Sequence, residues 1–145
     1  MSRGWVVDAS VAVKLYLPED LSNAAENLFS EPLIVGRRRF FVPDLFYVEC
    51  ANIFWKYVRR FNIPQGHARK SLKNLASLTL LSVSSNDLLH SALDLALEYG
   101  ISAYDASYVA LAHQMDLPFV TADEKLIGKL KGSDTEAVWL GDFGS

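Results

Sequence analysis

Four acidic residues stand beside apolar segments in a pattern that could bind a metal ion. They are Asp8, Glu49, Asp105 and Asp123. Carboxylates that come within a few ångströms of one another repel unless a cation lies between them. Hard divalent cations prefer oxygen ligands. The pattern therefore predicts a site for Mg²⁺ or Mn²⁺, provided that the fold brings the four acids together.

Each of these acids also has a purely structural interpretation. Asp8 and Asp105 stand where helices are expected to begin and could serve as N-caps. Asp123 could be a turn residue, and Glu49 could be exposed on a helix. Together these roles explain the pattern less well, because four independent accidents would each have to leave an acid beside an apolar run.

Short apolar segments between the acids are typical of buried strands in a parallel sheet. We expect strands at residues 5–7, 40–42, 78–83, 119–121 and 137–140. Asp8 directly follows one of these segments, and Asp123 follows another after a single residue, Ala122. Acids in that position lie at the carboxyl edge of a parallel sheet, where open α/β sheets form their sites.

Helical periodicity predicts the segments between the strands. We expect helices at residues 11–17, 21–29, 45–60, about 64–76, 87–99 and 125–130, and a helical run that starts near Asp105. Residues 37–39, all arginine, are expected to form a loop. This alternation predicts an α/β fold with a central parallel sheet of four or five strands, flanked by helices and joined by right-handed crossovers.

The apolar residues of two expected helices lead to further predictions about packing. In the segment 45–60 they cover more than one stripe, so a second packing partner besides the sheet is expected. They include Phe46, Phe54, Trp55, Tyr57, Val58 and, just beyond, Phe61. In the segment 87–99 the residues expected to face inward are Leu89, Ala92, Leu93, Ala96 and Leu97. Cys50 is expected to be a small buried hydrophobe.

Length and composition limit what such a site can belong to. With 145 residues, half of them hydrophobic, residues 1–145 are expected to form a single globular domain. The net charge of -3 argues against a protein that grips nucleic acid with its whole surface, but it allows a local basic patch. One cysteine and the lack of a signal-like or membrane-spanning segment lead us to expect a cytoplasmic protein.

Four motifs, in this order and spacing, closely resemble those of PIN-domain nucleases of the compact VapC-like kind. They are residues 6–10, residues 43–45 followed by Glu49 and Asn52, residues 103–106 followed by Tyr108 and Ala110, and residues 120–123. The resemblance covers nearly the whole chain. It implies a PIN-like three-layer sandwich and Mg²⁺- or Mn²⁺-dependent cleavage of RNA.

The resemblance also assigns roles to individual residues. The four acids match the family's catalytic and metal-binding quartet, and Ser10 and Thr121 match hydroxyl positions that could orient a water molecule or a ligand carboxylate. VapC-like proteins are toxins of prokaryotic toxin–antitoxin pairs, so a small antitoxin partner and a homodimer are implied.

Candidates for contacts to RNA phosphates, which an acidic site cannot attract unaided, are Lys14, Arg37, Arg38, Arg39, Arg59 and Arg60.

Other functions remain open at this stage. A receiver-like phosphoacceptor would need an adjacent acidic pair after the first strand, and a haloacid-dehalogenase-like phosphatase would need an aspartate at position 10, which is serine. A housekeeping RNA-processing nuclease and a non-catalytic PIN module that binds RNA or protein are the stronger alternatives. The sequence does not identify the RNA, nor does it choose between one metal ion and two.

Overall fold

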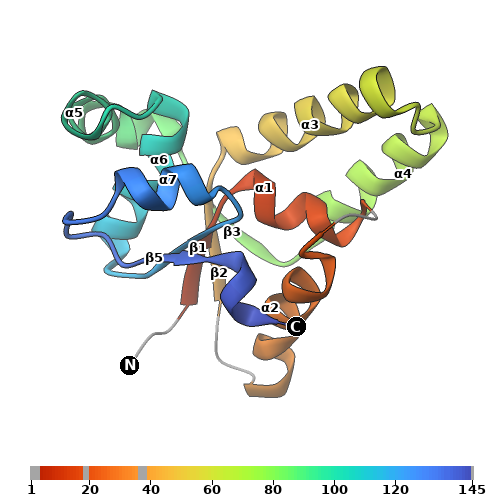
Figure 1. The fold of residues 1–145 in the computed structure, drawn as a ribbon, viewed down its shortest axis with the longest axis horizontal. Coiled ribbons are helices and arrows are strands. Elements are labelled where there is room, and N and C mark those ends of the chain that lie inside the picture. The colour runs from red at the N-terminus through yellow and green to blue at the C-terminus, as the bar shows by residue number, and fades with distance from the viewer. Residues whose placement is uncertain (1–3, 18–19, 36–38, 145) are drawn as a thin grey trace.

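A five-stranded parallel sheet forms the centre of the molecule in the computed structural model, which describes residues 4–17, 20–35 and 39–144 (Figure 1). The strand order is β3-β2-β1-β4-β5, and every neighbouring pair is parallel. The strands are β1 (Gly4–Val7), β2 (Arg39–Pro43), β3 (Leu80–Val83), β4 (Phe119–Thr121) and β5 (Ala137–Trp139). The predicted fold class is confirmed, with five strands.

Helices and short 3-10 turns connect the strands, and one further 3-10 turn follows the last strand. The helices are α1 (Ala9–Ala12), α2 (Ser22–Val35), α3 (Leu45–Phe61), α4 (Gln65–Ala76), α5 (Leu89–Tyr99), α6 (Ala103–Met115) and α7 (Glu124–Lys129). The 3-10 turns are η1 (Val13–Leu15), η2 (Ser85–Leu88) and η3 (Leu140–Phe143). In the part of the chain that the structure describes, no helix has both the length and the apolar character needed to cross a membrane.

The direction of the connections determines which helices cover which face of the sheet. From β1 the chain moves outward through β2 to β3, then returns past β1 to form β4 and β5. Because such crossovers are right-handed, α1 to α4 and α5 to α7 belong on opposite faces. Figure 1 shows this for α2 and for the α5–α6 pair, which lie on opposite sides of the sheet. The winding direction therefore reverses between β1 and β4.

The tight packing of α6 on the sheet follows from small side chains. Ala106, Ala110 and Ala112 are each at most 4% exposed, and α6 contacts β1, β2 and β4. On the strands themselves, Val6, Val7 and Val120 are fully buried. The buried strands and the inward alanine face were both expected from the sequence. Together they fix the positions from which the edge acids project.

The exposed face of α5 contradicts the sequence-based prediction. Leu89, Leu93 and Leu97, expected to face inward, are 55%, 54% and 75% exposed. The residues that α5 buries are Ala92 and, just before the helix, Leu88. Helix α5 carries two adjacent apolar stripes, and periodicity alone could not decide which of them would meet α6. We call Leu89, Leu93 and Leu97 the α5 stripe.

The second packing partner expected for α3 is supplied within the chain itself. Phe46, Cys50 and Phe54 recur every four residues and are at most 3% exposed, as expected for the core face of a helix. Helices α1 and α4 both pack against α3. Trp55 and Phe61 nevertheless remain 55% and 65% exposed. Val48, near the beginning of α3, is 73% exposed. The excess of apolar surface is therefore smaller than predicted and is spread along the helix.

Several element boundaries also differ from the predictions. Helix α2 continues to Val35, six residues beyond its predicted end, although the apolar pattern breaks before that point. The first helical segment is split into α1 and η1 and begins at Ala9, directly after Asp8. Arg39, expected in a loop, is the first residue of β2, and Arg37 and Arg38 lie outside the described residues.

Candidate active site

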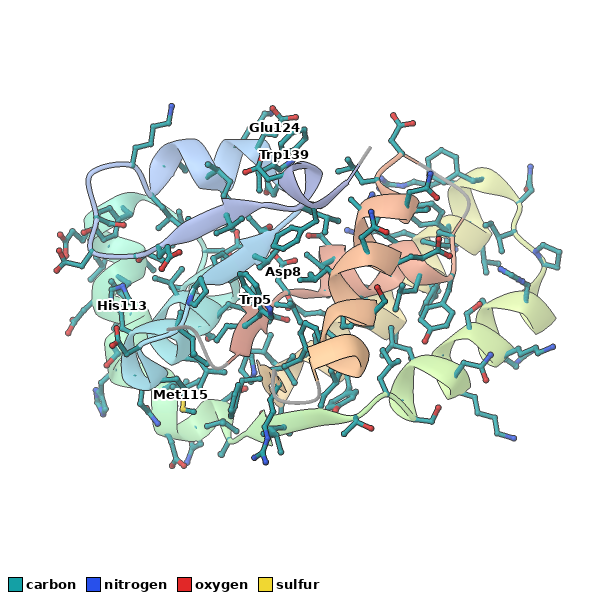
Figure 2. All side chains as sticks on the ribbon, turned by 90° about the horizontal axis from the view of Figure 1, so that it is seen from below. Trp5, Asp8, His113, Met115, Glu124 and Trp139 are labelled. Carbon is teal, nitrogen blue, oxygen red and sulfur yellow. The ribbon has the colours of Figure 1, made fainter. Side chains whose placement is uncertain are left out.

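The predicted acids come from four elements around the point where the sheet changes winding direction. Asp8 follows β1, and Asp123 follows the neighbouring strand β4. Glu49 lies near the beginning of α3, and Asp105 lies in the first turn of α6. Figure 2 shows Asp8 deep between the layers of the molecule. A doubly wound sheet opens a crevice at the carboxyl ends of its strands at such a point.

Asp8 is the most tightly held of the four acids. Its side chain is 6% exposed, and each of its carboxylate oxygens accepts a hydrogen bond from a hydroxyl group. Ser10 Oγ donates to Oδ1 at 2.5 Å, and Thr121 Oγ1 donates to Oδ2 at 2.6 Å. Asp8 occupies the N-cap position of α1, but its side chain makes no cap hydrogen bond. Its carboxylate is thus directed to these hydroxyls and not to the helix.

The two hydroxyls link Asp8 to the loop that follows β4. Ser10 Oγ accepts a hydrogen bond from the backbone N–H of Ala122 at 3.1 Å. Thr121 Oγ1 accepts one from the backbone N–H of Asp123, also at 3.1 Å. Each hydroxyl therefore donates to Asp8 and accepts from the β4 loop, so the orientation of the Asp8 carboxylate depends on where Asp123 lies.

Negative charge at this position is costly for the folded protein. Burial raises the pKa of Asp8 to about 7, the hydrogen bonds from Ser10 and Thr121 lower it, and the charges of Asp105 and Glu49 raise it. The carboxylates thus influence one another through space. This is the mutual repulsion that the sequence pattern predicted for an acidic cluster without a cation.

Glu49 is held by a tyrosine whose role was not predicted from the sequence. Tyr108 Oη donates a hydrogen bond of 2.5 Å to Glu49 Oε1. Burial raises the pKa of Glu49, the Tyr108 hydrogen bond lowers it and the charge of Asp105 raises it. Tyr108 is 1% exposed, and its ring stacks on Phe119 of β4 with ring centroids 6.1 Å apart. One signal in the sequence pointed to Tyr108. It follows Asp105 by three residues, so the two side chains lie on the same face of α6.

Asp105 and Asp123 lie nearer to solvent than Asp8. Burial raises the pKa of Asp105, as does the charge of Asp123, whereas the Ser102 hydroxyl and the Lys129 ammonium lower it. Ser102 is the N-cap of α6, so Asp105 does not have the capping role that was considered for it. Asp123 does cap a helix, because its Oδ1 accepts hydrogen bonds from the backbone N–H groups of Lys125 and Leu126 at 3.0 and 3.2 Å.

The cluster fits a divalent cation by its chemistry but is not a preassembled cage. Among the described residues, no group of three or more His, Cys, Asp or Glu side chains is arranged to hold a metal ion. The donors are nevertheless all carboxylates, the ligands that Mg²⁺ and Mn²⁺ prefer, and the charges of Asp105 and Glu49 already raise the pKa of Asp8. A cation would replace this repulsion by attraction.

The predicted phosphate-binding residues that the structure describes lie on three different elements, η1, β2 and α3. Lys14 is partly buried on η1. Arg39 is exposed at the amino end of β2, whereas the acids lie toward the carboxyl ends of the strands. Lys129, at the end of α7, acts on the cluster, because its charge lowers the pKa of Asp105. Nothing in the sequence distinguished Lys129 from other lysines.

Comparisons with known proteins agree with the fold and with the motif pattern. The family model of the PIN domain matches residues 5–130. The chain is 36% identical to Ribonuclease VapC3 of Pyrobaculum aerophilum over 126 residues, which cover 86% of this chain and 92% of that protein. It is 32% identical to Exonuclease VapC9 of the same organism over 100 residues, or 69% of this chain and 74% of that protein. The crystal structure of PAE2754 from P. aerophilum has a TM-score of 0.72 and 25% identity, covering 98% of this chain and 94% of that one.

The buried charge of Asp8 leads to a prediction about stability and pH. Its pKa is about 7 in the folded state, against 3.8 without the fold, so between these values the folded state binds more protons and loses stability as pH rises. An asparagine at position 8 carries no charge to bury. In chelator, Asp8→Asn should therefore have a higher melting temperature than the wild type at pH 8, and the difference should shrink toward pH 4.

The control for this measurement is Asp94→Asn, which changes an exposed acid on α5. Its melting temperature should follow that of the wild type across the whole pH range. A melting temperature of Asp8→Asn that is equal to or below the wild-type value at pH 8 would contradict the buried-charge interpretation.

The Tyr108–Glu49 hydrogen bond leads to a prediction about metal affinity. Tyr108→Phe removes the donor but keeps the ring that stacks on Phe119. Loss of a group that orients a ligand typically costs about 10–100-fold in affinity, so calorimetric titration with Mn²⁺ should show weakening of about that size. The control is Tyr104→Phe, which removes a hydroxyl from a side chain that is 65% exposed on the same helix. Equal Mn²⁺ affinities of the two variants would rule out this role for Tyr108.

Proposed function

Because the chain belongs to the VapC group of PIN-domain proteins, we propose that it is a metal-dependent endoribonuclease that hydrolyses RNA phosphodiester bonds. The observation that carries the proposal is the buried Asp8 carboxylate, held on both oxygens beside further acids where the sheet changes winding direction. The proposed catalytic and metal-binding residues are Asp8, Glu49, Asp105 and Asp123.

Each of these residues would have a distinct part in the reaction. Asp8 and Asp105 would hold Mg²⁺ or Mn²⁺, and Glu49 and Asp123 would bind it directly or through water. When bound, such an ion supplies an acidified water molecule and neutralises charge on the phosphate. Ser10 and Thr121 would keep the Asp8 carboxylate in one orientation through their hydrogen bonds.

The network around the acids supports this assignment because it limits their movement. A carboxylate that rotates freely would have to be ordered each time substrate binds, at a cost in entropy. Asp8 is fixed by Ser10 and Thr121, and one oxygen of Glu49 is fixed by Tyr108. Asp123 is fixed by the N–H groups of α7. Three of the four proposed ligands are therefore already oriented by hydrogen bonds.

The proposal predicts that RNA cleavage requires both a divalent ion and Asp105. Purified wild-type protein should cleave single-stranded RNA with Mg²⁺ or Mn²⁺ and stop when chelator is added. Asp105→Asn should lose activity by ~100-fold or more, because loss of groups that merely orient a ligand already costs up to about that factor. Its far-UV circular dichroism should match the wild type, and Asp94→Asn should keep full activity. Cleavage that persists in excess chelator would contradict the proposal.

The form of the substrate tests whether cleavage is internal. The two relatives carry different printed names, one a ribonuclease and the other an exonuclease. A covalently closed circular RNA has no ends, so an endonuclease cuts it and an exonuclease does not. Conversion of circles to linear products would support internal cleavage, and intact circles beside degraded linear RNA would assign the chain to the exonucleases.

We also propose that the chain is the toxin of a toxin–antitoxin pair and acts in the cytoplasm, where its RNA substrate is found. The support is its similarity to proteins named VapC. Expression of the chain alone should arrest bacterial growth, and Asp105→Asn should relieve the arrest. Where the neighbouring gene encodes a small antitoxin, its co-expression should do the same. Normal growth with active, soluble wild-type protein would instead favour a housekeeping RNA-processing nuclease.

A homodimer is the remaining part of the proposal. The α5 stripe supports it, because three leucines more than half exposed on one side of a helix are an apolar surface that a second copy can cover. Light scattering at micromolar concentration should give twice the chain mass of 16.2 kDa, and Leu93→Asp should give the single-chain mass. A wild-type monomer would contradict the dimer.

A further inference from the structure

The charges of this chain are divided unevenly between two parts of the fold. Residues 50–86 contain no Asp or Glu, although the chain has 17 of them. The same stretch contains six of the 14 Lys and Arg residues, all of them on α3 and α4. They are Lys56, Arg59, Arg60, Arg69, Lys70 and Lys73. We call these six residues the basic arm.

All six side chains of the basic arm are exposed. Lys56, Arg59 and Arg60 follow one another at helical spacing along one side of α3. Helix α4 then turns back against α3, and Figure 1 shows the two helices extending together from the rest of the molecule. Because residues 50–86 contain no carboxylate side chain, α4 supplies no acid to neutralise these charges. The one acid of α3 is Glu49, which lies near the beginning of that helix and is hydrogen-bonded to Tyr108. The arm therefore presents concentrated positive charge on a chain whose net charge is -3.

Helix α3 connects the basic arm directly to the proposed active site. Glu49 lies near the beginning of this helix, and the three cations of α3 follow seven to eleven residues later. At 1.5 Å per residue they lie roughly 10–16 Å farther along the helix axis. A strand cut at the acid cluster could thus reach the arm within a few nucleotides. The cluster itself repels phosphates, so the attraction must come from nearby cations.

We propose that the basic arm binds the phosphate backbone of single-stranded RNA that extends from the active site. The inference rests on the proposed ribonuclease function and adds the surface that grips the substrate. Trp55 supports single strands as the ligand, because it is 55% exposed and lies on α3 beside residues of the arm. The guanidinium carbon of Arg59 lies 5.3 Å from the centroid of the Trp55 ring, so a cation and an aromatic face stand side by side. This combination suits stacked bases and phosphates.

An acidic segment of a partner protein is the competing ligand for this surface. The arm favours RNA because its cations lie in rows on two helices, as a continuous polyanion requires, and because the proposed reaction needs such attraction. Other basic residues are less suitable. Lys125 and Lys131, for example, share the end of the chain with Glu124, Asp134 and Glu136.

The test compares two double variants with the same chemical change. Lys70→Ala/Lys73→Ala removes two exposed cations of the arm, and Lys125→Ala/Lys131→Ala removes two exposed cations around α7. The probe is a fluorescently labelled single-stranded RNA of mixed sequence, about 16 nucleotides long, which is the upper end of known site sizes. Binding is measured by anisotropy over a series of salt concentrations in chelator, so that no cleavage occurs.

The arm variant should bind more weakly, and its plot of log affinity against log salt should be shallower by about 1.4, or about 0.7 for each lost contact. The α7 variant should keep the wild-type slope. Trp55→Leu should weaken binding several-fold without changing the slope, because it removes stacking and no charge. Matching circular dichroism spectra of all variants would confirm that folding is intact.

Three results would overturn the inference. The first is that the wild type does not bind RNA, and the second is that the two double variants have equal slopes of log affinity against log salt. The third is that polyglutamate competes as strongly as unlabelled RNA, which would assign the arm to an acidic protein segment. These results differ from failure of the proposed function. RNA cleavage without dependence on the arm would refute only the arm, whereas arm-dependent binding without metal-dependent cleavage would refute only the nuclease.

Discussion

The rest of the site depends on one constraint, the burial of the Asp8 carboxylate between two parallel strands. A buried carboxylate is tolerated only when its oxygens are hydrogen-bonded, and here the hydroxyls of Ser10 and Thr121 provide those bonds. Thr121 ends β4, so β1 and β4 must be neighbours for the bond to form. Each hydroxyl also accepts an N–H from the β4 loop, which orders that loop. A single buried charge thus ties together parts of the chain more than one hundred residues apart.

The topology of the sheet is what makes this arrangement available. The chain winds outward to β3 and then crosses back to β4, so β1 and β4 become adjacent at the point where helices leave toward opposite faces. Helix α3 brings Glu49 from one side, and α6 brings Asp105 and Tyr108 from the other. The alanine face of α6 lets this helix lie close to the strands. The acids approach one another because backbone packing requires it, against their mutual repulsion.

Much of this could be predicted from the sequence, for identifiable reasons. Apolar runs that end in an acid locate β1, β4 and the edge positions of Asp8 and Asp123, because period and chain direction are local properties. The partner of Glu49 was missed, because the helical spacing relates Tyr108 only to Asp105, whereas its hydrogen bond goes to a residue 59 positions away. The outward side of α5 was also missed, since both of its apolar stripes satisfy the helical period. The extension of α2 was missed because the apolar pattern breaks before the helix ends.

Asp123 has two roles, as the N-cap of α7 and as a proposed metal ligand, and these roles place different requirements on its side chain. Helix α7 needs only an oxygen that accepts two backbone N–H groups, and asparagine or serine caps a helix about as well as aspartate does. A cation needs the negative charge. Replacement of this residue by asparagine would therefore preserve the helix while removing the charge. At this position the chain can lose a metal ligand and keep its fold. A non-catalytic binding module that evolved from such an enzyme could therefore have the same backbone structure as the enzyme.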